Sequence, residues 1–413
     1  MALVRFKRAF WRSFFRLVIF TAALAEWICL AWVAGVMLAV PIPWFAHLLG
    51  PVGLHLLNRR VLGSRPGPAA TRRTPFVRAY VGVVFTCLFG MIALLVNAVL
   101  WAAVAVVFAV VSHMGASLSP ADVLWPAQVT GSVALLVVSA LLAWGYGPGQ
   151  RAVRVLEVEV PVHELPSAFD GFRIAQISDI HLGGFMDEER LAAHIEHVNS
   201  LGADLICITG DITDGLDHAP RTFPVLGRLA APDGVIAILG NHDFYTGADA
   251  VTAALCELTS IRVLRDESVA LEREHSRLHI LGVDDAGVDW TRGVREHRAL
   301  PALIEAIPDG ETRILLSHRP ELFHQAISFG ISLTLSGHTH GGQIAVPWPL
   351  RRPSSLARFI SDFPRGTYRV NGSVLHVNLG LGVTGQPVRL FSPREITLIT
   401  LRRAQPGNEG ARS

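Results

Sequence analysis

The chain has 413 residues, of which 51% are hydrophobic and only 17% are charged. Soluble globular chains carry about 25% charged residues, so this composition excludes a disordered or collagen-like chain and disfavours an ordinary cytosolic enzyme. The four cysteines are too few and too scattered for a disulfide framework or a cysteine-based zinc site.

The formal net charge of +2 hides a division between two parts of the chain. Residues 1–150 hold 11 basic residues and two acids, whereas residues 151–413 hold 25 basic and 32 acidic residues. The basic residues of the first part flank apolar runs and do not line one face, so we expect no nucleic-acid partner. A charge-poor part joined to a charged part is typical of a membrane anchor followed by a soluble domain.

Long apolar runs predict that residues 1–150 form a transmembrane helical region in a lipid bilayer. A span needs about 20 apolar residues, and the first run is long enough for two spans with Pro41 and Pro43 near the turn. A cleaved signal peptide does not fit, because the run is too long and further apolar runs follow it. We therefore expect about four spans, at 15–36, 38–57, 79–111 and 127–147.

Arginine placement predicts the orientation of these spans. Basic residues precede the first span, fill the loop at 59–78 and follow the last span at Arg151 and Arg154, whereas 112–126 holds no Lys or Arg. With four spans the three basic segments share one side, which the positive-inside rule makes cytoplasmic. We therefore expect a multi-pass plasma-membrane protein with its soluble domain in the cytoplasm; a count of three spans would place that domain outside.

The hydropathy pattern of the sequence changes near residue 151. Residues 151–166 are interpreted as a linker, residues 167–403 as a folded domain and residues 404–413 as a disordered tail. Short β-branched runs alternate with amphipathic helical patterns, at 188–201 and 248–258 for example, which predicts an α/β layered fold. The expected strands are 173–178, 204–209, 235–239, 278–283, 313–317, 332–336, 374–378 and 396–401.

Potential metal ligands follow several of these strands. Open α/β sheets bind ligands at the carboxyl ends of their strands, so we expect side chains placed there to converge. Imidazoles with carboxylates and an amide oxygen suit borderline divalent ions such as Mn²⁺, Fe²⁺ or Zn²⁺. The candidate ligands are Asp179, His181, Asp211, Asn241, His318, His338 and His340.

Seven ligands exceed what one ion needs. Two ions about 3.5–4 Å apart, sharing one carboxylate, would use all of them. Such a pair lowers the pKa of a bound water, so that metal-bound hydroxide can attack, and stabilises the charge that develops in an in-line displacement at phosphorus. The sequence therefore predicts a dinuclear hydrolytic centre with two divalent ions (Mn, Fe or Zn) as cofactors.

The order of the motifs carries a family resemblance. They run Asp-x-His at 179–181, Gly-Asp-x-x-Asp at 210–214, Gly-Asn-His-Asp at 240–243, the lone His318 and Gly-His-x-His at 337–340. This set resembles the calcineurin-like metallophosphoesterase superfamily over about residues 170–401, in particular its membrane-anchored bacterial branch. It is also similar to eukaryotic transmembrane proteins with a metallophosphoesterase domain. The resemblance implies a four-layer αββα sandwich of two mixed sheets, here preceded by the helical region.

The resemblance also implies a role for each motif residue. His242 would protonate the leaving alkoxide or bind the phosphate, and Asp214 would orient its imidazole. The first metal would be held by Asp179, His181 and His340, the second by Asn241, His318 and His338, with Asp211 bridging the two.

Two further residues are candidates for substrate binding. Arg389 would contact a substrate phosphate or brace its loop with an acid, and Gln343 would contact the substrate or support the site from behind. Between the last metal motif and the late strands, Trp348, Phe359 and the arginines at 351–352 belong to an insertion. It is interpreted either as an ordinary packed loop or as a lid or lipid-facing surface.

Together these features predict a membrane-anchored dinuclear-metal phosphoesterase. The expected substrate is a phosphate ester, a phosphodiester in preference to a monoester, and lipid-linked or envelope-derived because the site would lie near the bilayer. Two alternatives stay open at this point: a non-catalytic metal-binding membrane sensor or scaffold, and a transporter with a regulatory esterase domain. A transporter would require more intramembrane charges than the single Glu26, which is better interpreted as a protonated or interhelical group.

Overall fold

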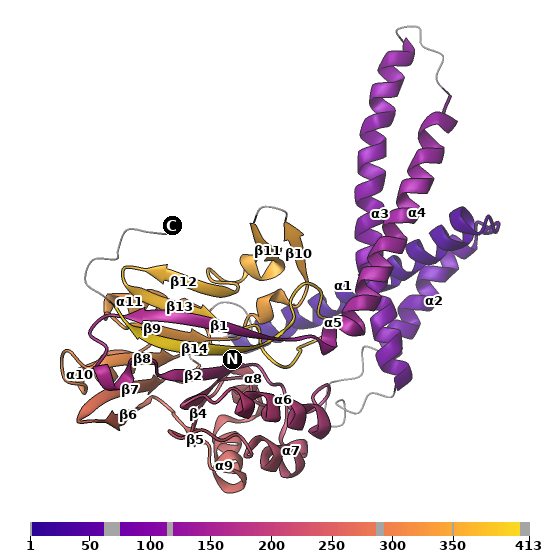
Figure 1. The fold of residues 1–413 in the computed structure, drawn as a ribbon. Coiled ribbons are helices and arrows are strands. Elements are labelled where there is room, and N and C mark those ends of the chain that lie inside the picture. The colour runs from indigo at the N-terminus through magenta and orange to yellow at the C-terminus, as the bar shows by residue number, and fades with distance from the viewer. Residues whose placement is uncertain (1, 62–74, 114–118, 286–292, 349–350, 405–413) are drawn as a thin grey trace. The chain divides into compact units, whose positions relative to one another are not determined.

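A computed structural model describes residues 2–61, 75–113, 119–285, 293–348 and 351–404 (Figure 1). The chain divides into two compact units, residues 1–144 and 145–413. The first unit is helical, and the second combines strands with shorter helices. The expected order of a helical region followed by an α/β domain is therefore confirmed, with the division after Trp144 and not after residue 150. The expected tail at 404–413 lies outside the described residues except for Ala404.

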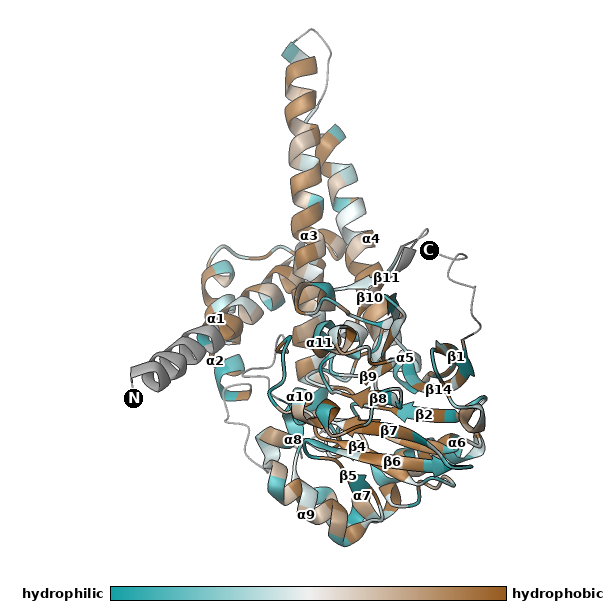
Figure 2. Cartoon of the chain, turned by 90° about the vertical axis from the view of Figure 1, so that its left-hand side faces the viewer, coloured by the Kyte–Doolittle hydropathy of each residue, from teal (hydrophilic) through white to brown (hydrophobic). Residues whose placement is uncertain are grey.

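Long apolar helices dominate the first unit, as the brown ribbons of α3 and α4 show (Figure 2). Its helices are α1 (Ala2–Trp32), followed by a π-helical turn at Val33–Met37, α2 (Ala46–Val61), α3 (Pro75–His113) and α4 (Ala121–Tyr146). Among the described residues, three helical segments are long and apolar enough to cross a membrane: Arg16–Met37, Phe76–His113 and Ala121–Arg151. These three candidate spans correspond to the spans expected at 15–36, 79–111 and 127–147.

The expected span at 38–57 is wrong. The helix in this region, α2, has 16 residues, which corresponds to about 24 Å against a hydrocarbon core of about 30 Å. Pro41 and Pro43 lie in the non-helical chain before it, where their missing N–H groups oppose an earlier helix start, and its last turn carries Arg59 and Arg60. Three candidate spans therefore replace the four that apolar run length predicted.

A buried polar network links three helices of this unit. Asn58 of α2 donates a hydrogen bond of 2.6 Å from Nδ2 to Glu26 of α1, and the Tyr80 hydroxyl of α3 donates one of 2.7 Å to Asn58 Oδ1. Glu26 and Asn58 are both buried. Glu26 is thus an interhelical acceptor, which is one of the roles that the sequence suggested for it.

Two six-stranded sheets form the second unit. The first contains β1 (Val153–Val162), β2 (Arg173–Ile177), β3 (Leu205–Thr209), β4 (Val235–Ile238), β5 (Arg262–Val263) and β14 (Arg394–Arg403), in the order β1-β14-β2-β3-β4-β5. The second contains β6 (Glu267–Arg273), β7 (Ser276–Gly282), β8 (Thr312–Leu316), β9 (Leu333–Ser336), β12 (Gly366–Val370) and β13 (Ser373–Val377), in the order β12-β13-β9-β8-β7-β6. A separate hairpin pairs β10 (Ala345–Trp348) with β11 (Arg351–Ser355). All eight expected strands are present within two residues of their expected limits.

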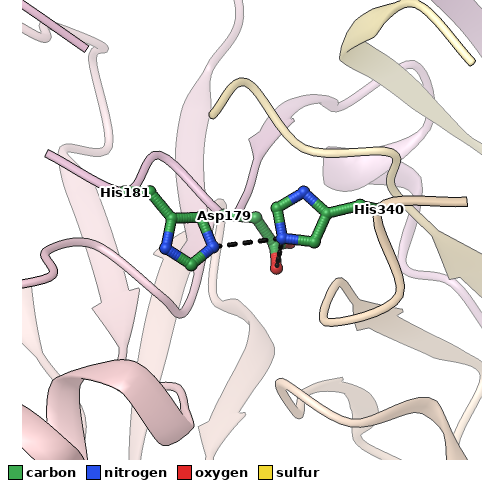
Figure 3. Close-up of side chains that lie close together, drawn as sticks. All are labelled: Asp179, His181 and His340. Atoms are coloured by element: carbon green, nitrogen blue, oxygen red, sulfur yellow. Dashed lines mark hydrogen bonds and ion pairs between the residues drawn. The ribbon is translucent and has the colours of Figure 1, made fainter. Parts of the chain in front are cut away.

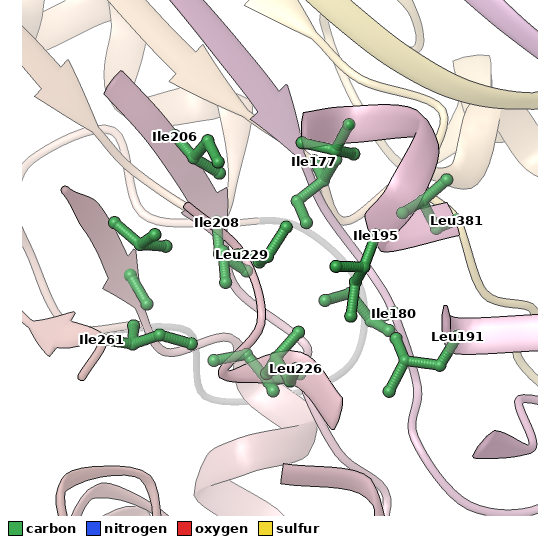
Figure 4. Packing of buried hydrophobic residues seen from close by; sticks show 14 of the residues in the cluster. Ile177, Ile180, Leu191, Ile195, Ile206, Ile208, Leu226, Leu229, Ile261 and Leu381 are labelled. Carbon is green, nitrogen blue, oxygen red and sulfur yellow. The ribbon is translucent and has the colours of Figure 1, made fainter. Parts of the chain in front are cut away.

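Three apolar clusters define the layers of this unit. Side chains of both sheets fill the central cluster, around Ile174, Ile280 and Ile314. On the outer face of the first sheet, Ile177 packs with Leu191 and Leu226 from the helices (Figure 4). A third cluster joins the second sheet to its own helices. The four-layer αββα sandwich is therefore confirmed.

The helices of the two outer layers are short. Over the first sheet lie α6 (Glu188–Ser200), α7 (Ala219–Leu226) and α9 (Ala248–Leu258), with α8 (Asn241–Thr246) just before α9, and over the second lie α10 (Leu300–Glu305) and α11 (Phe323–Ser328). α5 (Pro148–Arg151) precedes the first strand. The helices expected at 188–201 and 248–258 are α6 and α9, so both expectations are confirmed.

Residues 151–166 are not a linker. The strand β1 runs through this segment and pairs in parallel with β14 along its full ten residues, from Val153 opposite Arg394 to Val162 opposite Arg403. Val160 and Val162 are fully buried in the central core. The segment has the near-alternation of apolar and charged residues that a half-buried strand requires, and the proline and glutamates within it obscured that pattern.

The pairing of β1 predicts where the soluble unit can be cut. A chain beginning at Gly145 should fold, whereas one beginning at Ser167 leaves β14 with an open edge and loses two buried valines. We expect the shorter chain to lose at least about 3 kcal/mol of unfolding free energy. Denaturant unfolding of both chains measures this difference, and equal stabilities would contradict the structural role of β1.

Candidate metal centre

The expected metal ligands come from the carboxyl ends of strands in both sheets. Each of β2, β3, β4, β8 and β9 is followed by a short loop that carries one or two of them. These ligands are Asp179 and His181 after β2, Asp211 after β3, Asn241 after β4, His318 after β8, and His338 and His340 after β9. Face-to-face packing of the two sheets thus brings together residues that lie up to 161 positions apart in the sequence.

Asp179, His181 and His340 form the first cluster of potential ligands (Figure 3). His340 Nε2 lies 3.3 Å from Asp179 Oδ1 and 3.1 Å from His181 Nε2. All three side chains are buried. Two imidazole nitrogens that face each other beside a carboxylate form a site where a cation could be held in place of protons.

Asp211, His318 and His338 form a second cluster. His318 Nε2 lies 3.3 Å from Asp211 Oδ2, and the rings of His318 and His338 are 5.1 Å apart. The same Asp211 oxygen lies 3.6 Å from His181 Nε2 of the first cluster. One carboxylate therefore reaches both clusters, which is the placement expected for a bridging ligand.

Asn241 adds a further oxygen beside these clusters. It is buried at the start of α8, and its Oδ1 has no hydrogen-bond partner, as is also true of His318 Nε2. The next residue, His242, donates its backbone N–H to Asp211 Oδ1 over 2.8 Å. A buried acceptor without a donor costs about 1–3 kcal/mol, and a divalent ion would relieve that cost. The donor set present thus fits divalent metal ions.

The electrostatics of the centre follow from burial and close charge pairs. Burial raises the pKa of Asp179. Burial acts in the same direction on Asp211, but the charge of His318 overrides it and holds the pKa of Asp211 well below its usual range. Burial lowers the pKa of His318, yet the Asp211 carboxylate outweighs it and raises that pKa to about 10. A ligand protonated in this way releases its proton when a metal binds.

Asp214 orients two histidines at once. Its Oδ1 lies 2.8 Å from Nδ1 of His242 and 2.8 Å from Nδ1 of His181. Burial would raise its pKa, but the charge of His181 lowers the pKa of Asp214 strongly. The sequence predicted that Asp214 orients His242, but it did not indicate that Asp214 also orients His181. In this arrangement Asp214 supports a potential metal ligand, His181, through its second ring nitrogen and orients the imidazole of His242.

Asp243 is a supporting residue that sequence reasoning did not identify. Its buried carboxylate accepts backbone N–H groups from Gly240 at 2.9 Å, Ile212 at 3.0 Å and Thr213 at 3.0 Å. Burial and the nearby Asp211 raise the pKa of Asp243 to about 7. This side chain ties the loop after β3 to the loop after β4. The sequence signal for this supporting role is the position of Asp243 at the end of the Gly-Asn-His-Asp motif.

Several potential ligands adopt strained backbone conformations. Asp179, His181, Asp211, His338 and His340 all have φ between 49° and 70°. This left-handed region costs a residue with a side chain roughly 1–2 kcal/mol. Strain of this kind persists only where surrounding contacts hold the loop, so the contacts behind the ligands are part of the site.

Arg389 is one of these contacts and not a substrate ligand. Its side chain is 1% exposed, and its guanidinium donates to the carbonyl oxygens of Leu379, Gly380 and Gly382 over 2.6–3.0 Å and to two further carbonyls of its own loop. A Cβ at Gly380 would lie 2.8 Å from the Cβ of Asp179, so this loop packs directly on the first cluster. The expected substrate contact is corrected: Arg389 braces its loop, through carbonyl oxygens and not through an acid.

Gln343 is likewise engaged within the protein. Its Nε2 donates to the carbonyl oxygen of Thr384 over 2.8 Å, and its Oε1 accepts the Thr384 backbone N–H over 3.0 Å. Both ends of the carboxamide are therefore used to join the loop after His340 to the loop before Arg389. Gln343 therefore supports the site by joining these two loops, which is the second of the two roles expected for it, and not by contacting a substrate.

The brace predicts that Arg389 controls metal affinity. Arg389→Met should weaken metal binding about tenfold or more and lower the free energy of unfolding by about 2–4 kcal/mol, because buried carbonyl oxygens lose their donors. Arg369→Met, at an exposed arginine that donates to the carbonyl of Glu159, is the matched control. Metal titration and denaturant unfolding measure both effects. A changed KM with unchanged metal affinity would indicate a substrate contact instead.

Comparison with known proteins places this geometry in a family. Residues 172–342 match the family model described as calcineurin-like phosphoesterase, a range that contains all the potential metal ligands. The chain is also 32% identical over 314 residues to a transmembrane protein with metallophosphoesterase domain from Danio rerio, covering 72% of this chain and 70% of the relative. The chain belongs to the calcineurin-like metallophosphoesterase family.

Bacterial relatives of this metallophosphoesterase have a similar percentage identity. An uncharacterized metallophosphoesterase of Bacillus subtilis, YkuE, is 33% identical over 286 residues, which cover 66% of this chain and 95% of the relative. Another, from Aquifex aeolicus, is 31% identical over 255 residues, which cover 60% and 92%. The name of the Danio rerio relative combines a transmembrane protein with a metallophosphoesterase domain.

Proposed function

We propose that the protein is a membrane-anchored phosphoesterase with a dinuclear metal centre, acting on a phosphodiester that is lipid-linked or envelope-derived. The observation that carries the proposal is the position of Asp211 between two ligand clusters, with His242 alongside it. A structural metal site needs neither a shared carboxylate nor an adjacent, partly exposed imidazole. The preference for a diester rests on the family resemblance, and the lipid link rests on the apolar helices.

In this proposal the metals are held by the two clusters described above. Two divalent ions would supply Lewis acidity toward the phosphoryl oxygens and lower the pKa of water for the attack on phosphorus. The first would be bound by Asp179, His181 and His340 and the second by Asn241, His318 and His338, with Asp211 shared.

His242 supplies the proton for the leaving group. Its Nδ1 is engaged by Asp214, which leaves Nε2 to donate to the departing alkoxide oxygen. The Asp214 carboxylate orients the ring for this transfer, and the side chain of His242 is 29% exposed, so a substrate can reach it. Asp211 holds the backbone of His242 through the 2.8 Å hydrogen bond and thereby links the position of the proton donor to the metal centre.

A hydrolysis assay on the detergent-purified full chain tests this function. The substrates are a chromogenic phosphodiester and the matching monoester, with metal removed and then with Mn²⁺, Fe²⁺ or Zn²⁺ restored. We expect metal-dependent hydrolysis that Asp211→Asn abolishes with loss of bound metal. His242→Ala should lower kcat about 10²- to 10⁴-fold while both ions stay bound.

An exposed histidine provides the control for this assay. His275→Ala, in the turn between β6 and β7, removes an imidazole far along the chain from the motifs and should leave kcat unchanged. Two bound ions per chain without hydrolysis of either ester would overturn the enzymatic proposal in favour of a metal-binding membrane sensor or scaffold.

We also propose that the soluble unit lies on the cytoplasmic side of the plasma membrane. With three spans, the arginine-rich loop at 59–78 shares a side with Arg151 and Arg154, and together they hold eight arginines against five basic residues before the first span. This larger count favours a cytoplasmic position under the positive-inside rule. It also reverses the earlier inference that three spans would place the domain outside.

Reporter fusions test this orientation. A fluorescent protein that matures only in the cytoplasm should be bright when fused after Arg403 and dark when fused after His113, at the end of α3. The two fusions lie on opposite sides of the last candidate span and so control for each other. The reverse pattern would show that the soluble unit is outside.

A further inference from the structure

Large apolar side chains are exposed next to the loop that carries His338 and His340. Val346 in β10 is 61% exposed, and Leu356 and Phe359 in the short helix after β11 are 71% and 70% exposed. The Arg358 guanidinium lies 5.8 Å from the centre of the Phe359 ring. These four residues, Val346, Leu356, Arg358 and Phe359, are named the docking surface. Exposed apolar groups that cluster in this way mark a surface that another body covers.

The base of this surface is firmly attached to the metal loop. Ala345 donates its backbone N–H to the carbonyl oxygen of Leu390 over 2.9 Å, so the hairpin is tied to the loop that Arg389 braces. At the other end, Thr339 Oγ1 donates to the carbonyl oxygen of Pro364 over 2.8 Å. Thr339 stands between two potential metal ligands. The apolar side chains therefore belong to elements that are hydrogen-bonded to the loops of the metal centre.

The charge around the docking surface differs in sign from that of its domain. Residues 351–365 contain four arginines and one acid, Asp362, a formal net of +3. Residues 151–413 as a whole contain 25 basic and 32 acidic residues, a net of −7. Asp362 is already paired, with Arg295 at 2.6 Å and His324 at 3.2 Å. A segment of net positive charge within an acidic domain favours an anionic partner.

A pocket beside the docking surface has the chemistry to accept a phosphate group. Its lining holds two arginines, four residues with hydroxyl groups and one acid: Arg358, Arg365, Ser354, Ser355, Ser361, Tyr368 and Asp362, whose carboxylate is paired with Arg295 and His324. Ser355 is buried, and its Oγ has no hydrogen-bond partner. Guanidinium groups and hydroxyls together form the charge-assisted hydrogen bonds that phosphate oxygens accept.

We propose that the docking surface binds the interfacial region of an anionic phospholipid bilayer, with Leu356 and Phe359 among the acyl chains and the arginines at the lipid phosphates. Aliphatic and aromatic groups beside arginines are the composition of membrane interfaces, where apolar burial and attraction to anionic lipid act together. The same chain contains three helices long and apolar enough to cross a membrane, so a bilayer is a partner that the chain itself supplies.

Docking would hold the metal loop at the membrane surface. Because both ends of the hairpin region bond to the loops of the centre, a bilayer that receives Phe359 would present its phosphoesters close to His340. The substrate class that follows is a phosphoester whose anchor stays in the bilayer during hydrolysis. This part of the inference rests on the proposed function, whereas the docking itself does not.

A spin label on the full-length protein tests docking without any enzyme assay. The label is placed by Phe359→Cys in a Cys256→Ser parent, and the unsubstituted parent is labelled in parallel to subtract the remaining cysteines. Val370→Cys, at another exposed apolar position on the edge strand β12, is the matched control. Accessibility to oxygen and to a water-soluble nickel complex is measured in detergent, in phosphatidylcholine nanodiscs and in nanodiscs of equal parts phosphatidylcholine and phosphatidylglycerol.

The expected result is specific for position and lipid. In phosphatidylglycerol nanodiscs the label at 359 should gain oxygen accessibility and lose nickel accessibility several-fold, and the label at 370 should change in neither disc. A label at 359 that stays open to nickel in every disc would overturn the proposal. Protection that already occurs in detergent and grows with protein concentration would also overturn it, because a second copy of the chain would then be the occupant.

Kinetics separate docking from the proposed function. With a chromogenic phosphodiester carried on a lipid in the same nanodiscs, the double variant Leu356→Ser, Phe359→Ser should raise KM about tenfold or more with kcat little changed. Val370→Ser is the control and should match the wild type. If the wild type hydrolyses neither this ester nor a soluble one, the proposed function fails while the label still reports docking. An equal KM for both variants with active enzyme would overturn the link between docking and substrate.

Discussion

The structure of the soluble unit depends on keeping Asp211 charged inside the protein. Its carboxylate is 2% exposed, and a Cβ on the neighbouring Gly240 would lie only 2.3 Å from its Oδ1. A buried carboxylate costs several kcal/mol unless positive charge and hydrogen bonds surround it. Here His318 and His181 approach one oxygen and the backbone of His242 donates to the other. Both ligand clusters can form beside each other because the Asp211 carboxylate faces a histidine of each of them.

Groups behind the ligands hold this arrangement in place. Potential ligands with positive φ would relax if their loops were free, and the fold prevents this with buried polar side chains directed at backbone atoms. Asp243 collects the N–H groups of two loops, and Arg389 collects the carbonyl oxygens of a third. A carboxyl group and a guanidinium group thus have complementary roles, and both have backbone atoms as their main partners. The hairpin with the docking surface grows from the same braced loops, which couples the centre to the surface that we propose meets the bilayer.

Much of the soluble fold was predictable because local patterns decide it. Eight strands and the helices α6 and α9 were expected from β-branched runs and amphipathic periods, and all are present. The strand β1 was missed because its identity depends on β14, some 240 residues later, which provides the ladder and buries Val160 and Val162. The span expected at 38–57 failed for the opposite reason. Apolar content was sufficient there, but prolines before Ala46 shortened the helix.

The sequence by itself determined the family, the ordered motifs and the residue types of the centre, because metal chemistry restricts which side chains can stand after those strands. Only the tertiary structure decided how they meet: that Asp211 reaches both clusters, that Asp214 serves two histidines, and that Arg389 faces carbonyl oxygens and not a substrate. A motif specifies which donors and acceptors are available. Which donor meets which acceptor depends on the packing of two sheets against each other, and that packing is not a local property of the chain.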